Sequence, residues 1–361
     1  MTVFIGVIVL IVIVFVLVVL IVVSSGVLKS NKYCNIDLNN GRKKITARAG
    51  LTLLEVLNDN KIFMPSYCSG KGTCGACKCR IIDGDNEITS IELAALSYSQ
   101  KSKGFRLACQ VKVYQDIKVV VSEEVFNTKK YVCTYNSSRQ LSPTIKEIIF
   151  DLPKGNSIDF VPGQYVQIEI NGKESCLRAY SLANLNSEKN IVKIVVRIVP
   201  NGIGSTYLWN LKEEDSVILT GPYGNFIPLN DYQKNKEIVY IAGGVGIVPI
   251  MSHLKYFEEI GCSGNISLWY GANIRDELLD CSDFDGIDIR YAIRDSLKED
   301  LKENEYQGLI PDIVFNEYLK KHDTPEEIVY YICGPKQMTQ RMEQLLYSLG
   351  VEEGNIIKDE L

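Results

Sequence analysis

The sequence predicts a multidomain protein: an N-terminal transmembrane helix, a small domain with a cysteine-rich loop, an antiparallel β-barrel and a C-terminal α/β domain. Three observations lead to this prediction. The chain has 361 residues, which is enough for two or three domains of ordinary size. It begins with a long uncharged apolar segment, and four cysteines fall within twelve residues further on. Its last third alternates apolar strands with glycine turns and helical segments.

The composition is that of a globular protein and excludes some classes of function. Hydrophobic residues make up 46% of the chain, charged residues make up 23%, and the net charge is −5. A nucleic-acid-binding protein would carry a strong excess of positive charge, so we expect no nucleic-acid partner. Only two histidines are present, which argues against a histidine-rich metal site and against a histidine-based catalytic triad.

The first segment, residues 3–23, contains no charged residue. As a helix it would span about 30 Å, the thickness of one hydrocarbon core. A signal peptide, the alternative, would have a basic residue before a shorter apolar stretch, and no lysine or arginine precedes this one. We therefore expect a permanent anchor within residues 1–28. Basic residues follow it, so the positive-inside rule places residues 30–361 in the cytoplasm.

The cysteine-rich loop, CSGKGTCGACKC, begins at Cys68. Eleven cysteines in a reducing compartment do not indicate a disulfide framework. The spacing Cys68-x5-Cys74-x2-Cys77, followed by the distant Cys109, supplies the four thiolates that a [2Fe–2S] cluster requires. The interleaved glycines would let the loop fold tightly around inorganic sulfide. A structural zinc site is the alternative, although such sites usually pair two C-x2-C motifs. We expect Cys79 to be a small buried hydrophobic residue.

The region 129–232 contains strand-like segments separated by turns, which favours an antiparallel barrel. Two motifs stand out, RAYS at residues 178–181 and NGIGSTYLWNL. In the second, Gly204, Ser205 and Thr206 lie at the expected N-terminus of a helix. Free N–H groups, a favourable dipole and hydroxyl donors at such a position bind phosphate. Each motif alone is a weak signal, because a glycine-rich turn is usually only a turn, but their order and spacing strengthen the prediction.

The region 236–361 has the pattern of an α/β domain. In AGGVGIVP, a strand leads through Gly243, Gly244 and Gly246 into a helix. Pro249 stands where the dinucleotide-binding fingerprint has its third glycine, and proline suits a first helical turn. A plain strand–helix connection without a ligand is the alternative.

A second candidate motif closes the chain's last apolar strand. This strand ends in Cys333-Gly334-Pro335, followed by a helix that contains Met338. A buried thiol at a strand end is the alternative explanation of Cys333.

These motifs resemble two known modules. Residues 33–122 resemble the β-grasp ferredoxin domain, of which some bacterial and vertebrate-type members share the x5 spacing. RAYS, GST, GPYG, AGGVG and CGP resemble the ferredoxin–NADP reductase superfamily. The resemblance implies a [2Fe–2S] cluster, an FAD bound by the barrel domain of residues 129–232, and NADH bound by the α/β domain of residues 236–361.

The resemblance also implies roles for single residues. Arg178 would pair with the flavin phosphates, Tyr180 would lie against the isoalloxazine and Ser181 would point near its reactive nitrogen. Ser205 and Thr206 fall where the superfamily holds the flavin pyrophosphate.

The motif C-G-P-x-x-M is the same superfamily's signature of the nicotinamide pocket. It implies that Cys333, followed by Gly334 and Pro335, lies beside the position of hydride transfer. Cys333 and Ser181 are therefore the expected residues of the catalytic site.

The apolar N-terminus narrows the resemblance to the F subunits of sodium-translocating NADH:quinone reductases. The shared motifs are YCSGKGTCGAC, RAYSLAN, GSTYLWNL, GPYG, AGGVGIVP, LWYGA and YICGP. The resemblance implies a single-pass subunit of the cell inner membrane that passes electrons from NADH through FAD and a [2Fe–2S] cluster to the other membrane subunits of a quinone-reducing, sodium-pumping complex. The alternatives are an anchored NADH-dependent reductase that serves another acceptor, such as an oxygenase, and an iron–sulfur scaffold without activity.

The sequence departs from this family at two places. LWYGA is usually followed by Arg-Ser, whereas Asn273 and Ile274 stand here and Arg275 is displaced, which favours NADH over NADPH. The family ends in an aromatic residue that covers the flavin, but Leu361 ends this chain, so the flavin face would be more open or covered by a partner. The final KDEL also spells an endoplasmic-reticulum retention signal, which the expected topology argues against.

Overall fold

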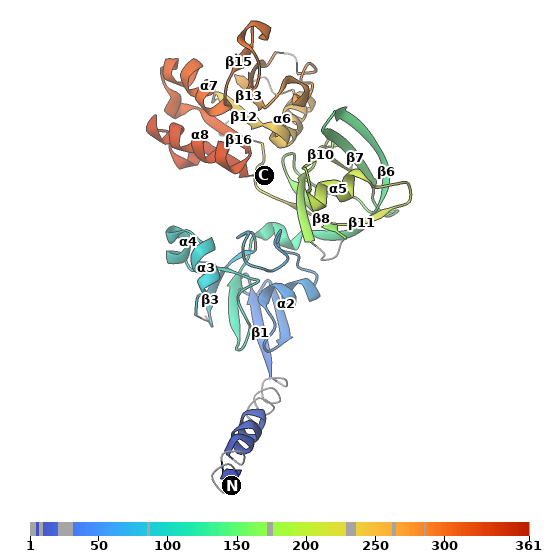
Figure 1. Cartoon of the computed structure of the whole chain (residues 1–361), viewed down its shortest axis with the longest axis vertical. Helices are drawn as coiled ribbons and strands as arrows, with labels where there is room; N and C mark the ends of the chain where they lie inside the picture. Colours follow the sequence, from blue (N-terminus) through green and yellow to red (C-terminus); the bar gives the residue numbers. More distant parts are fainter. Residues whose placement is uncertain are drawn as a thin grey trace. The chain divides into compact units, whose positions relative to one another are not determined.

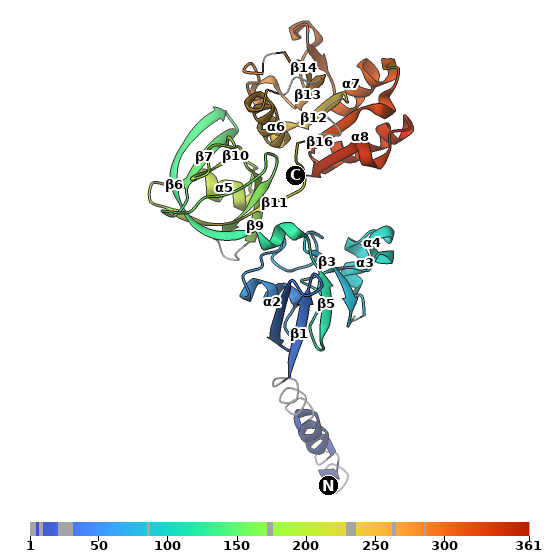
Figure 2. The same cartoon turned by 180° about the vertical axis from the view of Figure 1, so that it is seen from behind.

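The structure is a computed structural model that describes residues 5–6, 10–20, 32–84, 87–171, 176–228, 236–261, 265–284 and 286–360. The chain divides into two compact units, Met1–Thr128 and Lys129–Leu361. Figures 1 and 2 show the elements of both units from opposite sides.

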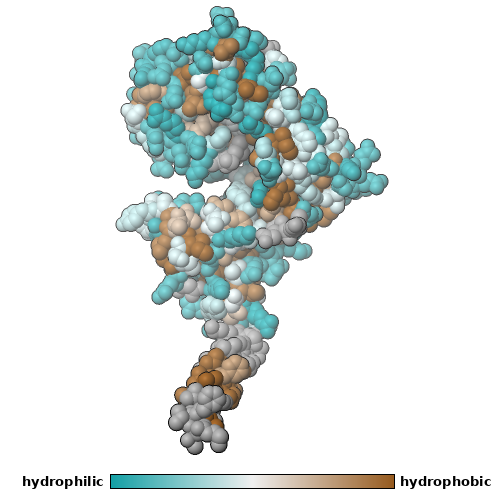
Figure 3. Space-filling model, viewed as in Figure 1, coloured by the Kyte–Doolittle hydropathy of each residue, from teal (hydrophilic) through white to brown (hydrophobic). Residues whose placement is uncertain are grey.

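Residues 10–20 form an apolar helix. Its hydrophobic side chains are exposed, from 43% for Val19 to 67% for Phe15, and Figure 3 shows them in brown. Among the described residues, no helix has the length and apolarity that a membrane crossing requires. The span predicted for residues 3–23 lies partly outside the described residues.

The N-terminal unit is built on one five-stranded sheet with the order β2-β1-β5-β3-β4. β1 and β5 run parallel, and the other neighbouring strands run antiparallel. The strands are β1 (Tyr33–Leu38), β2 (Lys43–Arg48), β3 (Lys78–Asp83), β4 (Phe105–Leu107) and β5 (Ile117–Val120). A mixed sheet packed against a helix is the arrangement expected for the β-grasp domain.

Three short helices belong to this unit: α2 (Leu53–Asp59), α3 (Ser90–Ala95) and α4 (Tyr98–Ser102). Helices of this length are not stable alone, so their ends are fixed by local hydrogen bonds and packing. Each begins with a capping box, in which the cap side chain and the side chain three residues later each accept a hydrogen bond from the other's backbone N–H. The boxes are Thr52–Glu55, Thr89–Glu92 and Ser97–Gln100.

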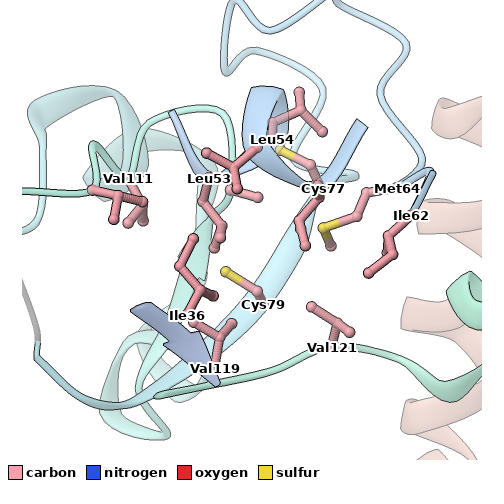
Figure 4. Close-up of a cluster of buried hydrophobic side chains, with 14 of the residues drawn as sticks. Ile36, Leu53, Leu54, Ile62, Met64, Cys77, Cys79, Val111, Val119 and Val121 are labelled. Carbon is pink, nitrogen blue, oxygen red and sulfur yellow. The ribbon is translucent and has the colours of Figure 1, made fainter. Parts of the chain in front are cut away.

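The core of the N-terminal unit lies between the sheet and α2. Leu53 of α2, Ile36 of β1 and Val119 of β5 are almost fully buried in it. Figure 4 shows Cys79 of β3 near Ile36 and Val119. Cys79 is buried there, as its sequence context predicts.

The second unit begins with a six-stranded antiparallel sheet of order β10-β7-β6-β11-β8-β9. Its strands and helix are β6 (Lys129–Ser142), β7 (Ile145–Asp151), β8 (Tyr165–Ile170), β9 (Cys176–Ser181), β10 (Ile191–Arg197), β11 (Ser216–Tyr223) and α5 (Ile203–Trp209). A bridge between Leu182 and Ile194 connects the end of β9 to β10, so the two edges of the sheet meet. This sheet has the antiparallel, closed pattern that the sequence predicts for a barrel.

The rest of the second unit is a parallel six-stranded sheet of order β15-β14-β13-β12-β16-β17. The strands are β12 (Ile238–Gly243), β13 (Ile266–Ala272), β14 (Asp288–Ile293), β15 (Glu305–Gln307), β16 (Val329–Gly334) and β17 (Ile356–Glu360). One face packs against α6 (Ile247–Glu259), and the other packs against α7 (Ile310–Glu317) and α8 (Lys336–Ser348). Every residue of β12 and β16 is buried, as expected for strands covered on both faces.

Short 3₁₀ turns complete the described elements. They are η1 (Glu123–Phe126), η3 (Gly244–Gly246), η4 (Arg275–Glu277), η5 (Lys298–Asp300), η6 (Leu319–Lys321), η7 (Pro325–Glu327) and η8 (Glu353–Asn355).

His253 of α6 is fully buried between the barrel and the parallel sheet. Its Nδ1 lies 3.2 Å from the Tyr240 hydroxyl and its Nε2 lies 3.1 Å from the carbonyl oxygen of Phe226. The ring stacks on Phe226 at a centroid distance of 5.2 Å. Burial lowers the pKa of His253 to about 4, so the imidazole is neutral in the folded protein.

This burial predicts a loss of stability in mild acid. The unfolded chain has an ordinary histidine pKa, so it binds more protons than the folded chain between about pH 6.5 and 4. Stability that is fully present above pH 6.5 should fall by up to about 3 kcal/mol as the pH drops through this range. The side chain in His253→Gln cannot be protonated, so the stability of this variant should depend less on pH. The measurement is the temperature at which the FAD-loaded full chain releases its flavin, followed by flavin fluorescence.

The other histidine supplies a matched control. His322 lies at a partly exposed position beside Glu237, and His322→Gln should keep the steep acid dependence of the wild type. Equal pH profiles for wild type and His253→Gln would show that the buried imidazole does not cause the acid sensitivity.

Candidate functional site

The cysteine-rich loop lies between α2 and β3 and carries Cys68, Cys74 and Cys77. The chain turns sharply here. Gly72 has a φ of +79°, in the left-handed region that favours glycine. A Cβ at this position would lie 2.6 Å from Cγ2 of Ile91, so glycine also allows the loop to pack closely against α3.

The four predicted ligand cysteines form two pairs. The Sγ of Cys74 lies 3.3 Å from that of Cys68, and Cys77 hydrogen-bonds the sulfur of Cys109. In the part of the chain that the structure describes, no three His, Cys, Asp or Glu side chains surround a single ion position. A [2Fe–2S] cluster holds two irons with two protein ligands each, so two pairs of thiols fit its donor set.

The loop backbone stabilises negative charge on the first pair. Burial raises the pKa of the Cys68 thiol, but hydrogen bonds from the backbone N–H groups of Cys74, Thr73 and Gly72 outweigh this effect and lower it. Burial raises the pKa of Cys74, the donor of the pair. N–H groups turned toward sulfur are the feature expected of a loop that binds an anionic cluster.

The second pair joins the loop to a distant segment. The hydrogen bond from Cys77 lowers the pKa of Cys109 to about 6, while the same bond raises that of Cys77. The amide of Gln110 supports this site, because its Nε2 donates to the Cys109 sulfur at 3.4 Å and to the carbonyl of Gly70 at 3.2 Å. In each pair, the thiol that accepts the hydrogen bond has a lowered pKa and its donor has a raised one.

In the barrel, the structure brings Arg178 and Tyr180 of β9 against Gly204 of α5. A Cβ on Gly204 would lie 2.9 Å from Cγ of Arg178 and 3.4 Å from the Tyr180 hydroxyl. Burial raises the pKa of Tyr180 to about 12, so its hydroxyl remains a neutral donor. The guanidinium of Arg178 is exposed and donates to the carbonyl of Leu177 at 2.8 Å. An exposed guanidinium next to a glycine fits a phosphate group.

The hydroxyl groups of α5 differ in exposure. Ser205 is buried, and its Oγ accepts a hydrogen bond from the N–H of Val199 at 3.1 Å and donates to the carbonyl of Gly202 at 3.4 Å. Thr206 is exposed. Ser205 therefore fixes the turn before α5, and Thr206 presents a hydroxyl at the surface.

Ser181 is half-buried at the end of β9. The next residue, Leu182, accepts a hydrogen bond through its carbonyl from Oγ of Ser252 in α6 at 2.8 Å. This bond connects the predicted flavin side of the site to the helix that follows the glycine turn.

The two nicotinamide-domain motifs are in contact. β12 and β16 are parallel neighbours, so the glycine turn and the Cys333-Gly334-Pro335 segment lie at the same edge of the sheet. A Cβ on Gly246 would lie 2.3 Å from the carbonyl oxygen of Cys333, and one on Gly243 would lie 2.5 Å from Sδ of Met338. Cys333 is 0% exposed, and burial raises the pKa of its thiol far above the ordinary value.

A cleft of about 380 Å³ lies beside these motifs. It opens at the carboxyl ends of the parallel strands, where ligands bind in open α/β sheets. Of the residues predicted from sequence, Gly243, Gly244 and Pro335 line it. Pro249 is buried in the first part of α6, and Gly334 packs against Met338.

Several charged residues of this cleft were not predicted from the sequence. They are Arg197, Glu277, Arg294, Asp312 and Arg341. Arg197 ends β10 of the barrel, and its Nη2 lies 2.5 Å from Oε1 of Glu277 in the α/β layer. The sequence signal that could have pointed to Arg197 was its position as a charged residue at the end of an alternating strand. Arg275, the displaced arginine of the sequence, forms an ion pair with Glu305 and donates to the carbonyl of Asp300 at 2.7 Å.

Comparison with protein families places three modules in this order along the chain. Residues 36–114 match the 2Fe-2S iron-sulfur cluster binding domain, residues 132–227 match the oxidoreductase FAD-binding domain and residues 240–344 match the oxidoreductase NAD-binding domain. FAD, a [2Fe–2S] cluster and NADH are therefore the cofactors of this chain.

Curated relatives cover almost the whole sequence. The F subunit of the Na(+)-translocating NADH-quinone reductase of Methylococcus capsulatus is 34% identical, and the match covers 90% of each chain. Its counterpart in Mannheimia succiniciproducens is 35% identical over 90% of each chain.

Solved structures share the fold. A cytochrome P450 reductase from Amycolatopsis superposes with a TM-score of 0.72 at 22% identity, covering 91% of this chain and 98% of its own. A ferredoxin reductase in carbazole 1,9a-dioxygenase gives a TM-score of 0.68 at 22% identity, with 91% and 99% covered. The fold described here therefore recurs over nearly the whole length of these solved chains.

The paired thiols lead to a test of the cluster ligands. Replacing Cys68, Cys74, Cys77 or Cys109 with Ala should abolish the rhombic electron paramagnetic resonance signal of the reduced cluster, because one of the two irons would lose one of its two thiolates. Cys79→Ala is the matched control, since Cys79 is buried in the same core and should not affect the signal. NADH-dependent reduction of ferricyanide should survive in all five variants. A cluster lost in Cys79→Ala but kept in Cys77→Ala would contradict this ligand set.

Proposed function

Because the chain belongs to the family of Na⁺-translocating NADH-quinone reductase F subunits, we propose that it delivers electrons from NADH to the other membrane subunits of a quinone-reducing, sodium-pumping complex. The observation that carries this proposal is the contact between the glycine turn and the Cys333 segment at the edge of a nucleotide-binding cleft. The same chain also carries a barrel of the flavin-binding type and a loop with paired thiols.

The proposal assigns each cofactor to residues of this chain. The [2Fe–2S] cluster is held by Cys68, Cys74, Cys77 and Cys109 of the domain of residues 33–122. FAD is held in the barrel of residues 129–232 by Arg178, Tyr180, Ser181, Gly204, Ser205 and Thr206. NADH is held in the domain of residues 236–361 by Gly243, Gly244, Gly246, Pro249, Gly334 and Pro335.

When bound, FAD accepts two electrons from NADH as a hydride, and the cluster carries single electrons onward. Arg178 supplies a charge-assisted partner for the flavin phosphates, and Tyr180 lies against the isoalloxazine. Cys333 and Ser181 act as positioning groups that hold donor and acceptor at a short distance. Cys333 is itself completely buried, and its carbonyl contacts the glycine turn at Gly246.

We also propose that the N-terminal segment anchors the chain in the cell inner membrane as a single span, with residues 30–361 in the cytoplasm. The uncharged stretch of residues 3–23, the exposed apolar surface of the helix of residues 10–20 and the basic residues that follow support this topology.

The proposed hydride site predicts distinct outcomes for two variants. Cys333→Ala should slow flavin reduction by NADH by roughly ten- to a thousandfold while FAD content stays unchanged, because positioning rather than binding is lost. Arg178→Ala should instead lose FAD. Stopped-flow absorbance and flavin content of the full chain in detergent separate these outcomes.

Another buried thiol of the same unit provides the control. Cys281 is 2% exposed, and NADH should reduce the flavin of Cys281→Ala at the wild-type rate. If the flavin of Cys333→Ala were also reduced at the wild-type rate, the hydride site would have to lie elsewhere.

The proposed anchor predicts the behaviour of a truncated chain. Removal of residues 1–28 should move the protein from the carbonate-washed membrane fraction to the soluble fraction, because the apolar helix would be gone. Its NADH–ferricyanide activity should remain, and NADH-dependent quinone reduction in membranes should fall to background. A truncated chain that stays in the membrane and still supports quinone reduction would contradict the anchoring role.

A further inference from the structure

A buried ion pair in the N-terminal unit has no role in the function derived above. Glu92 of α3 is 0% exposed and Arg106 of β4 is 3% exposed. The pair is bidentate: Nε of Arg106 donates to Oε1 of Glu92 at 2.8 Å and Nη2 donates to Oε2 at 2.9 Å. Burial of two charges is expensive, and apolar residues of similar volume often stabilise a fold as well or better. Stability alone is therefore a weak explanation of the pair.

Additional hydrogen bonds satisfy the carboxylate of Glu92. Its Oε1 accepts from the N–H of Leu107 at 2.9 Å, and its Oε2 accepts from the N–H and the hydroxyl of Thr89 at 2.9 and 3.0 Å. Arg106 also donates to the carbonyl of Glu87 at 3.1 Å. A single carboxylate thus binds the start of α3 to the strand that leads to the fourth cysteine.

The fourth cysteine depends on this strand for its position. Leu107, which donates to Glu92, lies two residues before Cys109. The intervening Ala108 donates through its N–H to the carbonyl of Cys77 at 2.8 Å. Cys109 is the predicted ligand that lies outside the cysteine-rich loop, so its placement cannot come from the loop itself.

The other side of α3 touches the loop. Ile91, the neighbour of Glu92, packs against Gly72, where a Cβ would lie 2.6 Å from Cγ2 of Ile91. α3 therefore contacts the loop through Ile91 and the Cys109 strand through Glu92. α3 thus connects the two parts of the polypeptide that carry the four thiols, and the ion pair holds α3 to the second part.

We propose that the Glu92–Arg106 pair is a positioning device for the iron–sulfur site, which fixes Cys109 relative to the loop and balances the charge beside the cluster, and so sets its midpoint potential. This inference rests on the proposed ligand set. The potential of an iron–sulfur cluster depends on nearby charge, hydrogen bonds to sulfur and exposure to solvent. An arginine cation that lost its carboxylate would stabilise the reduced, more negative cluster.

The test is a reductive titration of the full chain in detergent, followed by the rhombic resonance signal of the cluster. Glu92→Gln keeps the size of the side chain but removes the negative charge beside Arg106. At a fixed potential, the ratio of reduced to oxidised cluster should rise roughly three- to tenfold, the effect of one charge at an intermediate dielectric. The double variant Glu92→Gln/Arg106→Gln removes both charges and should return the ratio to within about twofold of wild type.

An exposed ion pair of the same unit supplies the matched control. Asp83 and Lys118 are 3.5 Å apart, with side chains 68% and 59% exposed. Asp83→Asn also removes one carboxylate, but water and salt screen it, so the potential should not change. This control separates a local effect of the buried pair from a change in net charge.

Each remaining outcome decides the inference. If Glu92→Gln keeps full iron content and the wild-type potential, the pair is only structural and the proposal is wrong. If the variant is folded and reduces flavin normally but loses iron, and Glu92→Asp restores it, the positioning role is supported. If the variants lose the fold of the N-terminal unit by circular dichroism, the pair is a folding element and the proposal fails. A wild-type chain without any cluster signal would instead overturn the proposed ligand set.

Discussion

The close packing of Gly246 on the carbonyl of Cys333 is the constraint on which the C-terminal site depends. Parallel pairing of β12 with β16 brings the two segments to the same sheet edge, and only a residue without a side chain leaves room for the contact. Because Gly243 packs in the same way against Met338, the turn and the Cys333 segment behave as one surface. This packing fixes the positions of the cleft, of the buried thiol of Cys333 and of the start of α6.

Electrostatics organises the N-terminal site in a different way. The loop directs backbone N–H groups at Cys68, while Cys109 is held by hydrogen bonds from Cys77 and Gln110. Hydrogen-bond dipoles of the folded chain thus stabilise negative charge on these two sulfurs. Dipoles fixed in a folded loop need little reorganisation when an electron arrives, which suits a carrier of single electrons.

Much of this architecture could be predicted from the sequence, because each strand, turn and helix start is encoded by a pattern of residues that are close together in the chain. The alternating segments of residues 129–232 predicted antiparallel strands, and the glycine turn before a helix predicted the nucleotide-binding edge. The pairs Arg197–Glu277 and Glu92–Arg106 could not be predicted. Their members are 80 and 14 residues apart, and no spacing rule connects a strand end to a distant turn. The hydrogen bond by which Ser205 fixes the turn before α5 could not be predicted either, because a serine at this position is equally compatible with phosphate binding.

The division of the chain at Thr128 has a consequence for biosynthesis. All four predicted ligand cysteines and every strand of the first sheet precede this point. A ribosome that adds about 5–20 residues per second needs roughly 10 to 50 s to make the rest of the chain. During that interval the nascent N-terminal unit already contains every residue of its sheet and its thiol loop. Delivery of iron and sulfide can therefore precede completion of the polypeptide, whereas flavin can bind only after the strands of the barrel have been made.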